Sequence, residues 1–134
     1  MEQTLAIIKP DAVAAGNTGK IIDLIEKNGF QIDRMEKGML KKEHAENFYA
    51  VHKDKPFFGE LISFIVSGPI VVMALRKDNA INDWRNLMGS TDPQKADAGT
   101  IRKLYGTNVG NNAVHGSDST ENAERELALF FGEI

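Results

Sequence analysis

The chain has 134 residues, of which 42% are hydrophobic and 26% charged, with a formal net charge of −3 at pH 7 and no cysteine. This length suits one domain with a hydrophobic core, so we expect a single domain over residues 1–134. The lack of cysteine excludes disulfides and thiol chemistry, and the negative charge argues against a dedicated nucleic-acid binder.

No targeting segment is predicted. The N-terminus lacks a basic region followed by an apolar one, which is the pattern of a signal peptide. The longest apolar run, Ile70 to Leu75, is far too short to span a bilayer. We therefore expect a soluble cytoplasmic protein without a membrane partner. With three histidines and no His-x-x-x-His pair, a metal site held by the protein alone is not expected.

The chain begins with a predicted strand over residues 4–8, which Pro10 ends because proline cannot continue the hydrogen-bond ladder. Lys9 then occupies the last strand position, where its side chain can project into a cleft. An amphipathic helix is predicted over residues 18–28, with Asn28-Gly29 as its C-terminal cap, and a second strand over residues 30–40.

Two helices are predicted next. The first begins at about Glu43 and places four side chains on one face: Ala45, Phe48, Tyr49 and His52. The second begins at Pro56 and ends at Ser67-Gly68-Pro69.

A buried strand over residues 70–75 follows, because its apolar run is continuous. Asp78 then opens a helix that Gly89 closes. Residues 90–112 are predicted to form a long loop with one helical turn at about residues 100–104. A loop of this length inside a domain is usually functional.

The last segment is predicted to be a strand that ends in His115, a turn, and a helix capped by Asp118 or Ser119. Glu121, three residues after Asp118, fits a capping box. Without its insertions the element order is βαββαβ. This order is typical of the α+β ferredoxin-like fold, a four-stranded antiparallel sheet covered by helices, which we expect on one face, plus a long active-site loop.

His115 is the candidate nucleophile. A neutral imidazole can attack phosphorus because its pKa lies near the working pH and its lone pair is free. Gly116 removes a side chain that would block an incoming phosphate, and Ser117 offers a hydrogen bond. The alternative is a histidine that merely ends a strand and bonds a neighbour.

Several other polar side chains are candidates for holding phosphate groups. They are Arg85, Thr91, Arg102 and Asn112, with Lys9 and Tyr49 added if these face the same cleft. Phe57 can stack on a base. The alternatives are solvated helix charges for the two arginines and a core position for Phe57. The chain has no P-loop or Rossmann pattern, so side chains would have to hold a nucleotide.

Taken together, the motifs resemble those of the nucleoside diphosphate kinase family along nearly the whole chain. Six occur in the family's order, the last of them highly specific: Ile7-Ile8-Lys9-Pro10-Asp11, Lys55-Pro56-Phe57-Phe58, Ser67-Gly68-Pro69, Met88-Gly89-Ser90-Thr91-Asp92-Pro93, Gly99-Thr100-Ile101-Arg102 and His115-Gly116-Ser117-Asp118-Ser119.

The resemblance implies a role for each matching position. His115 corresponds to the phosphorylated histidine, and Ser117 and Glu126 to residues that support it. Phe57 matches the position that stacks on the base. The phosphate- and ribose-binding positions fall on Lys9, Tyr49, Arg85, Thr91, Arg102 and Asn112, and the apolar contacts at the mouth of the site on Leu61 and Val109.

The implied reaction is ping-pong transfer of a γ-phosphoryl group from a nucleoside triphosphate to a nucleoside diphosphate. Mg²⁺ is expected to arrive on the nucleotide's phosphates, because no carboxylate cluster would hold it. Two rivals stay open. One is a phosphocarrier or protein-histidine kinase that passes the phosphate of His115 to another protein. The other is a nucleotide- or nucleic-acid-binding regulator without turnover.

The sequence departs from the family pattern at few places. Ser90 replaces a commoner alanine, Arg76-Lys77 stands where an acidic residue is frequent, and the chain ends at Ile134 without the extension of many relatives. The resemblance implies a homo-oligomer built from dimers through the sheet and its flanking helix. The short C-terminus favours a tetramer over a hexamer.

Overall fold

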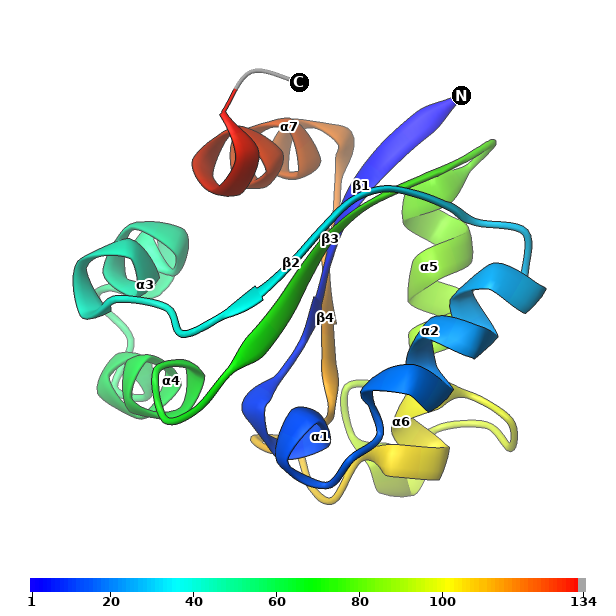
Figure 1. Ribbon diagram of the computed structural model, residues 1–134. Coiled ribbons are helices and arrows are strands. Elements are labelled where there is room, and N and C mark those ends of the chain that lie inside the picture. The colour runs from blue at the N-terminus through cyan, green and yellow to red at the C-terminus, as the bar shows by residue number, and fades with distance from the viewer. Residues whose placement is uncertain (133–134) are drawn as a thin grey trace.

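A four-stranded antiparallel sheet forms the centre of the computed structural model, which describes residues 1–132 (Figure 1). In the order β2-β3-β1-β4 the strands are β2 (Gln31–Gly38), β3 (Ile70–Lys77), β1 (Glu2–Ile8) and β4 (Val114–Gly116). This strand order and the antiparallel pairing confirm the predicted ferredoxin-like arrangement.

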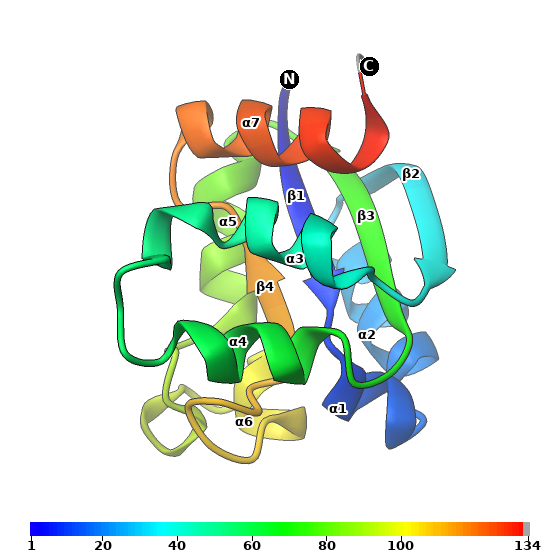
Figure 2. The same ribbon diagram turned by 90° about the vertical axis from the view of Figure 1, so that its left-hand side faces the viewer.

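Helices cover both faces of the sheet. On one face lie α1 (Pro10–Ala14), α2 (Thr18–Lys27), α5 (Ala80–Met88) and α6 (Ile101–Tyr105). On the other lie α3 (Lys42–Phe48), α4 (Phe58–Ile65) and α7 (Thr120–Phe131), which stand in front of the sheet in Figure 2. The expectation of helices on one face is correct for α2 and α5, the two helices of the βαββαβ unit. It is wrong for the whole sheet, because the inserted helices and α7 cover the second face.

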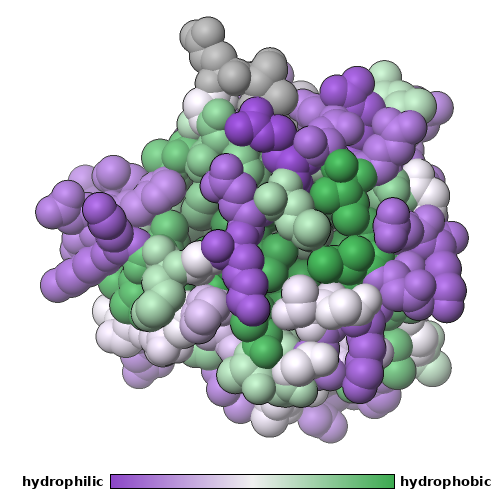
Figure 3. Space-filling model, in the orientation of Figure 1, coloured by the Kyte–Doolittle hydropathy of each residue, from purple (hydrophilic) through white to green (hydrophobic). Residues whose placement is uncertain are grey.

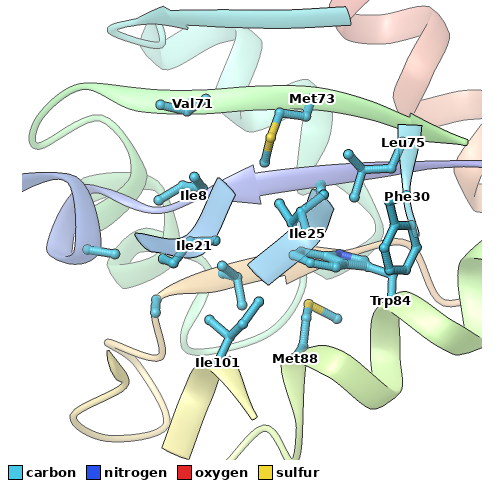
Figure 4. Close-up of a cluster of buried hydrophobic side chains, with 14 of the residues drawn as sticks. Ile8, Ile21, Ile25, Phe30, Val71, Met73, Leu75, Trp84, Met88 and Ile101 are labelled. Carbon is cyan, nitrogen blue, oxygen red and sulfur yellow. The ribbon is translucent and has the colours of Figure 1, made fainter. Parts of the chain in front are cut away.

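The two central strands explain why both faces are covered. In β1, Ala6 and Ile8 face the cluster that contains Trp84, and Leu5 and Ile7 face the cluster on the opposite side. Figure 4 shows the first cluster, in which side chains from α2, α5 and α6 pack against β1 and β3. A strand that is apolar on both sides must be covered on both sides, as its continuous apolar run predicts.

Most predicted boundaries agree with the structure to within a few residues. β1 ends at Ile8, so Lys9 lies just beyond the strand and precedes α1, a short helix that the sequence did not predict. Proline favours the first turn of a helix, where its missing N–H is not needed. The helix predicted from Pro56 begins at Phe58, which leaves Phe57 at the N-cap.

The region around Tyr49 also differs from the prediction. α3 ends at Phe48, and a separate 3₁₀ helix, Ala50–His52, follows. The long loop holds a second 3₁₀ turn, Pro93–Lys95, in addition to the predicted helical turn, which is α6.

The N-terminus of α7 decides between the two predicted caps. The hydroxyl oxygen of Ser119 accepts the backbone N–H of Asn122 at 3.1 Å, so Ser119 is the cap. The predicted capping box of Asp118 and Glu121 is therefore wrong, because the helix starts one residue later than that box requires. Asp118 instead accepts the side-chain amide of Asn122.

None of the helices in residues 1–132 is both long and apolar enough to cross a membrane. The short C-terminal end noted from the sequence, at Glu133 and Ile134, lies outside the described residues.

Candidate active site

A cavity of about 1120 Å³ collects the candidate residues from distant parts of the chain. Its walls come from Lys9 just after β1, from α3, the 3₁₀ helix, α4 and α5, from the long loop, and from β4 and α7. All predicted site residues except Ser117 line it: Lys9, Tyr49, Phe57, Leu61, Arg85, Thr91, Arg102, Val109, Asn112, His115 and Glu126. Ser117 is fully buried behind this wall.

His115 is the middle residue of β4, paired with Ile7 of β1, rather than the end of a strand as predicted. Its Nε2 atom lies 3.1 Å from Oε1 of Glu126 on α7. The hydroxyl of Ser117 donates to the same oxygen at 2.8 Å. A carboxylate can only accept, so Nε2 carries the proton and the lone pair of Nδ1 is free.

Burial lowers the pKa of His115 from its usual 6.5, and the bond to Glu126 opposes this shift without cancelling it. The positive charges of Lys9 and Arg102 lower the pKa further. The ring also packs edge-on against Phe48, with 5.0 Å between ring centroids. The imidazole is therefore neutral at pH 7 and held in one orientation, as a nucleophile requires.

Gly116 has a different role from the predicted one. A Cβ atom on Gly116 would lie 2.5 Å from Cδ1 of Trp84, on the face of the sheet away from His115. The indole Nε1–H of Trp84 also donates to the backbone oxygen of His115 at 3.2 Å. Glycine is required here because Trp84 packs directly under β4, and not because a side chain would block a phosphate.

Lys9 and Asn112 form a hydrogen-bonded row at one side of the cavity. The Lys9 ammonium donates to Oδ1 of Asn112 at 2.9 Å, and the Asn112 amide donates to the backbone oxygen of Thr91 at 3.0 Å. Burial, helped by the charge of Arg102, lowers the pKa of Lys9 to about 8, although Asp11 opposes the shift. Lys9 is therefore mostly charged at pH 7, and the cost of its burial favours an anionic partner.

Arg102 is only 8% exposed, and its guanidinium binds the backbone. It donates to the oxygens of Gly89 and Val114, each at 3.0 Å, and its Nε is buried without a partner. Burial and the neighbouring charge of Arg85 lower the pKa of Arg102 to about 10, so it stays charged at pH 7. The alternative of a solvated helix charge is thus wrong for Arg102. Arg85 is exposed but lies on the cavity wall.

Tyr49 is a hydroxyl donor in this cavity. Burial, together with the nearby charge of Glu126, raises the pKa of its phenol. The group therefore stays protonated at neutral pH and can donate a hydrogen bond.

Phe57 lines the cavity and is 39% exposed, so the alternative of a core position is wrong. Its ring lies edge-on to that of His52, with 5.7 Å between centroids. Val109 lies on the same wall and is 57% exposed. An exposed aromatic ring beside an apolar wall suits a planar, sequence-independent contact.

Among the cavity residues that were not selected from the sequence as site residues are His52, Asp118 and Arg125. Asp118 was interpreted as a helix cap, and a bond from Asn122 keeps the pKa of its carboxyl below the usual value. Arg125 lies 3.7 Å from the second carboxylate oxygen of Glu126, and no sequence pattern marks this contact. Within residues 1–132, no three His, Asp or Glu side chains come close enough to hold a metal ion.

Comparisons with known proteins agree with one another. The family model "Nucleoside diphosphate kinase" matches residues 2–134. A protein of Citrifermentans bemidjiense named nucleoside diphosphate kinase is 53% identical over all of this chain and 98% of its own length.

Two solved structures resemble the fold closely. That of the Aquifex aeolicus nucleoside diphosphate kinase superposes with a TM-score of 0.95 at 42% identity, covering 97% of this chain and 94% of its own. A halophilic nucleoside diphosphate kinase from Halobacterium salinarum, solved in complex with CDP, gives 0.94 at 42% identity, with 98% and 88% covered.

Proposed function

The chain belongs to the nucleoside diphosphate kinase family of phosphotransferases, and we propose that it works by a ping-pong mechanism through a phosphohistidine at His115. The γ-phosphoryl group of a nucleoside triphosphate moves to the histidine and from there to a second nucleoside diphosphate. The observation that supports this most directly is the bond between Nε2 of His115 and Glu126, which leaves the lone pair of Nδ1 free on a side chain that lines the cavity.

In the first half-reaction the lone pair of Nδ1 forms a bond to the γ-phosphorus. The bond from that phosphorus to the bridging oxygen breaks, and the diphosphate leaves with the electron pair. The ring becomes cationic while its Nε2–H still donates to Glu126, so the carboxylate stabilises the charge that develops. In the second half-reaction an oxygen of another diphosphate attacks the phosphorus, and the nitrogen–phosphorus bond breaks.

The phosphates are held by the positive side of the cavity. Lys9, Arg85 and Arg102 supply charge, and the hydroxyls of Tyr49 and Thr91 supply neutral donors. These groups neutralise a transition state whose charge spreads over the phosphoryl oxygens. The nucleotide enters as its Mg²⁺ complex, since the cavity offers the scattered carboxylates Asp118, Glu60 and Glu126 rather than a cluster of metal ligands.

The base is stacked on Phe57, against the apolar side chains of Leu61 and Val109. Every base has a π-face, so stacking tolerates all of them. One site can thus serve donor and acceptor nucleotides with different bases, and we expect Asn112 to bind a sugar hydroxyl.

We also propose a homo-oligomer built from dimers through the β2 edge and α2, with a tetramer expected over a hexamer. Within residues 1–132, β2 pairs with β3 alone, so the hydrogen-bonding groups on its other edge are open. Met35 on β2 is 52% exposed, and Figure 3 shows apolar surface between charged side chains on this side of the molecule.

The mechanism is tested by incubating the protein with γ-labelled ATP and removing the free nucleotide. We expect an acid-labile, base-stable label that is absent from His115→Ala. His44→Ala is the matched control, because His44 binds the backbone oxygen of Leu129 and lies outside the cavity wall. Its label should persist.

The same labelled protein distinguishes the rival functions. Adding an unlabelled nucleoside diphosphate should release the label as triphosphate. A label that only another protein discharges indicates a phosphocarrier, and a protein that binds nucleotide without labelling indicates a regulator.

A further inference from the structure

Ala113 has an unusual backbone conformation directly beside the proposed nucleophile. Its φ is +74°, in the left-handed region that favours glycine, and it is completely buried. Within residues 1–132 the other non-glycine residue with positive φ is Asn79, at the N-cap of α5. Asparagine tolerates this region because its short polar side chain can bond locally, whereas alanine has no such compensation. The N–H of Val114 donates to the oxygen of Asn112 at 2.9 Å, which closes a tight, strained turn around Ala113. Contacts with the rest of the fold must therefore support this local turn.

The turn after β1 holds both backbone groups of Ala113. The N–H of Lys9 donates to the oxygen of Ala113 at 2.8 Å. The N–H of Ala113 donates to Oδ2 of Asp11 at 3.1 Å. The first bond is between backbone groups and does not depend on residue type. The second depends on the side chain of Asp11.

Residues on either side of Ala113 carry the proposed site. The side chain of Asn112 accepts a hydrogen bond from the ammonium of Lys9 and donates one to the backbone oxygen of Thr91. Val114 offers its backbone oxygen to Arg102, and His115 comes next. Rotation of Ala113 to an ordinary φ would turn the chain between Asn112 and His115. This rotation would move the hydrogen-bonded side chains of Lys9 and Asn112 away from His115.

We propose that Asp11 is a positioning residue for phosphoryl transfer: its carboxylate holds Ala113 in the left-handed conformation and so fixes the positions of Asn112 and His115 relative to each other. This inference rests on the proposed function of His115. Asp11 is not among the residues that line the cavity, so it acts through the backbone of Ala113 and not on the substrate. The sequence placed Asp11 in a family motif without giving it a role.

Two other roles for Asp11 make different predictions. Asp11 lies in the first turn of α1, where a negative charge favours the helix, and its charge also favours the protonated form of Lys9. Both roles depend on charge. The hydrogen bond to Ala113 needs only an acceptor oxygen, so Asp11→Asn retains it and Asp11→Ala removes it.

The test uses the full chain at pH 7 and measures kcat and KM for phosphoryl exchange, with urea unfolding of every variant. We expect Asp11→Ala to lower kcat by about tenfold or more, with a smaller change in KM. Asp11→Asn should stay close to the wild-type kcat. Glycine adopts positive φ without strain, so Ala113→Gly alone should be close to wild type and should restore most of kcat when added to Asp11→Ala.

Asn79→Gly added to Asp11→Ala is the matched control, because it relieves positive φ at a site remote from His115 and should restore nothing. If Asp11→Ala fails to fold and the double variant with Ala113→Gly folds and exchanges, the inference is supported. The inference is overturned if the kcat of Asp11→Ala equals that of wild type, or if Asp11→Asn loses as much kcat as Asp11→Ala. It is also overturned if adding Ala113→Gly to Asp11→Ala restores no kcat, or if Asp11→Ala fails to fold both alone and together with Ala113→Gly. If the wild-type protein itself performs no phosphoryl exchange, the proposed function is contradicted. Failure of the proposed function is thereby distinguished from failure of the inference about Asp11, which depends on the variants.

Discussion

The imidazole of His115 and the carboxylate of Glu126 meet at 3.1 Å although they belong to different elements, β4 and α7. Glu126 is nearly buried, and its Oε1 also accepts the Ser117 hydroxyl. A carboxylate placed on Nε2 selects the tautomer with a free Nδ1 and would favour the imidazolium that the proposed attack forms. The reactivity of His115 therefore depends on how α7 packs against the sheet.

Glu126→Gln should lower the rate of phosphohistidine formation by roughly 10²-fold, because a neutral amide no longer stabilises the imidazolium and can present its NH₂ group to Nε2. Ser117→Ala should lower this rate less, since the carboxylate remains. Rapid-quench labelling of both variants measures the effect. Equal rates for Glu126→Gln and wild type would show that Glu126 only fills space.

The acid limb of kcat/KM should have its midpoint below pH 6.5, the usual pKa of histidine, because burial lowers the pKa of His115. In the proposed mechanism the neutral imidazole is the nucleophile, and this form exists above the pKa. A lowered pKa therefore extends activity to more acidic pH. A pH profile of kcat/KM, which reports the free enzyme, checks this. A midpoint above 6.5 would mean that the charge of Glu126 outweighs burial.

The alkaline limb of the same profile should have its midpoint near pH 8, where the buried ammonium of Lys9 loses its proton. Below this pH the charged group attracts phosphate, and above it the attraction is lost. Arg102, whose pKa is about 10, stays charged across this range. Lys9→Arg should remove this limb, though at a lower maximum rate, because a guanidinium does not fit the bond to Asn112. A limb near pH 8 that persists in Lys9→Arg would assign it to another group.

Phe57→Ala should weaken the binding of nucleotides with any base by a similar amount, about 1–3 kcal/mol, with little loss of fold stability, because the ring is partly exposed. Phe58→Ala is the matched control. The ring of Phe58 packs against the core below α4, so this variant should lose stability instead. Calorimetric titration with four diphosphates and urea unfolding separate the two. A loss for one base only would indicate hydrogen-bond recognition of that base.

Light scattering over a dilution series should give a mass that is an even multiple of the chain, with four chains expected. Replacing the exposed Met35 on β2 with Lys should reduce this mass, because the charge would face an identical strand edge. A mass of six chains contradicts the tetramer. A monomer at micromolar concentration contradicts association through β2.

Local patterns predicted the strands and the helices α2 to α7 in their order along the chain, but not α1 or the short 3₁₀ helices. The continuous apolar run of β3 marked a buried strand, and the amphipathic periodicity of α2 marked a helix with its end at Asn28-Gly29. The predicted first residues of helices were less accurate where neighbouring residues can each serve as the N-cap, as at Ser119 before α7 and Phe57 before α4. Residue chemistry and family motifs also indicated the charged and hydroxyl-bearing side chains that could bind phosphate on the cavity wall. His52 and Arg125 were missed, because nothing in their immediate sequence distinguishes them from ordinary surface residues.

The sequence by itself thus determined the order of the strands and main helices along the chain, the candidate nucleophile and the charges around it, since these follow from side-chain type and short-range periodicity. Only the tertiary structure decided that Gly116 makes room for Trp84, that Arg102 binds backbone oxygens, and that Asp11 holds Ala113. The reason is physical. Each of these contacts joins residues from separate elements, and their distance depends on how helices pack on the sheet. A local pattern records which groups are present, whereas packing decides which of them meet.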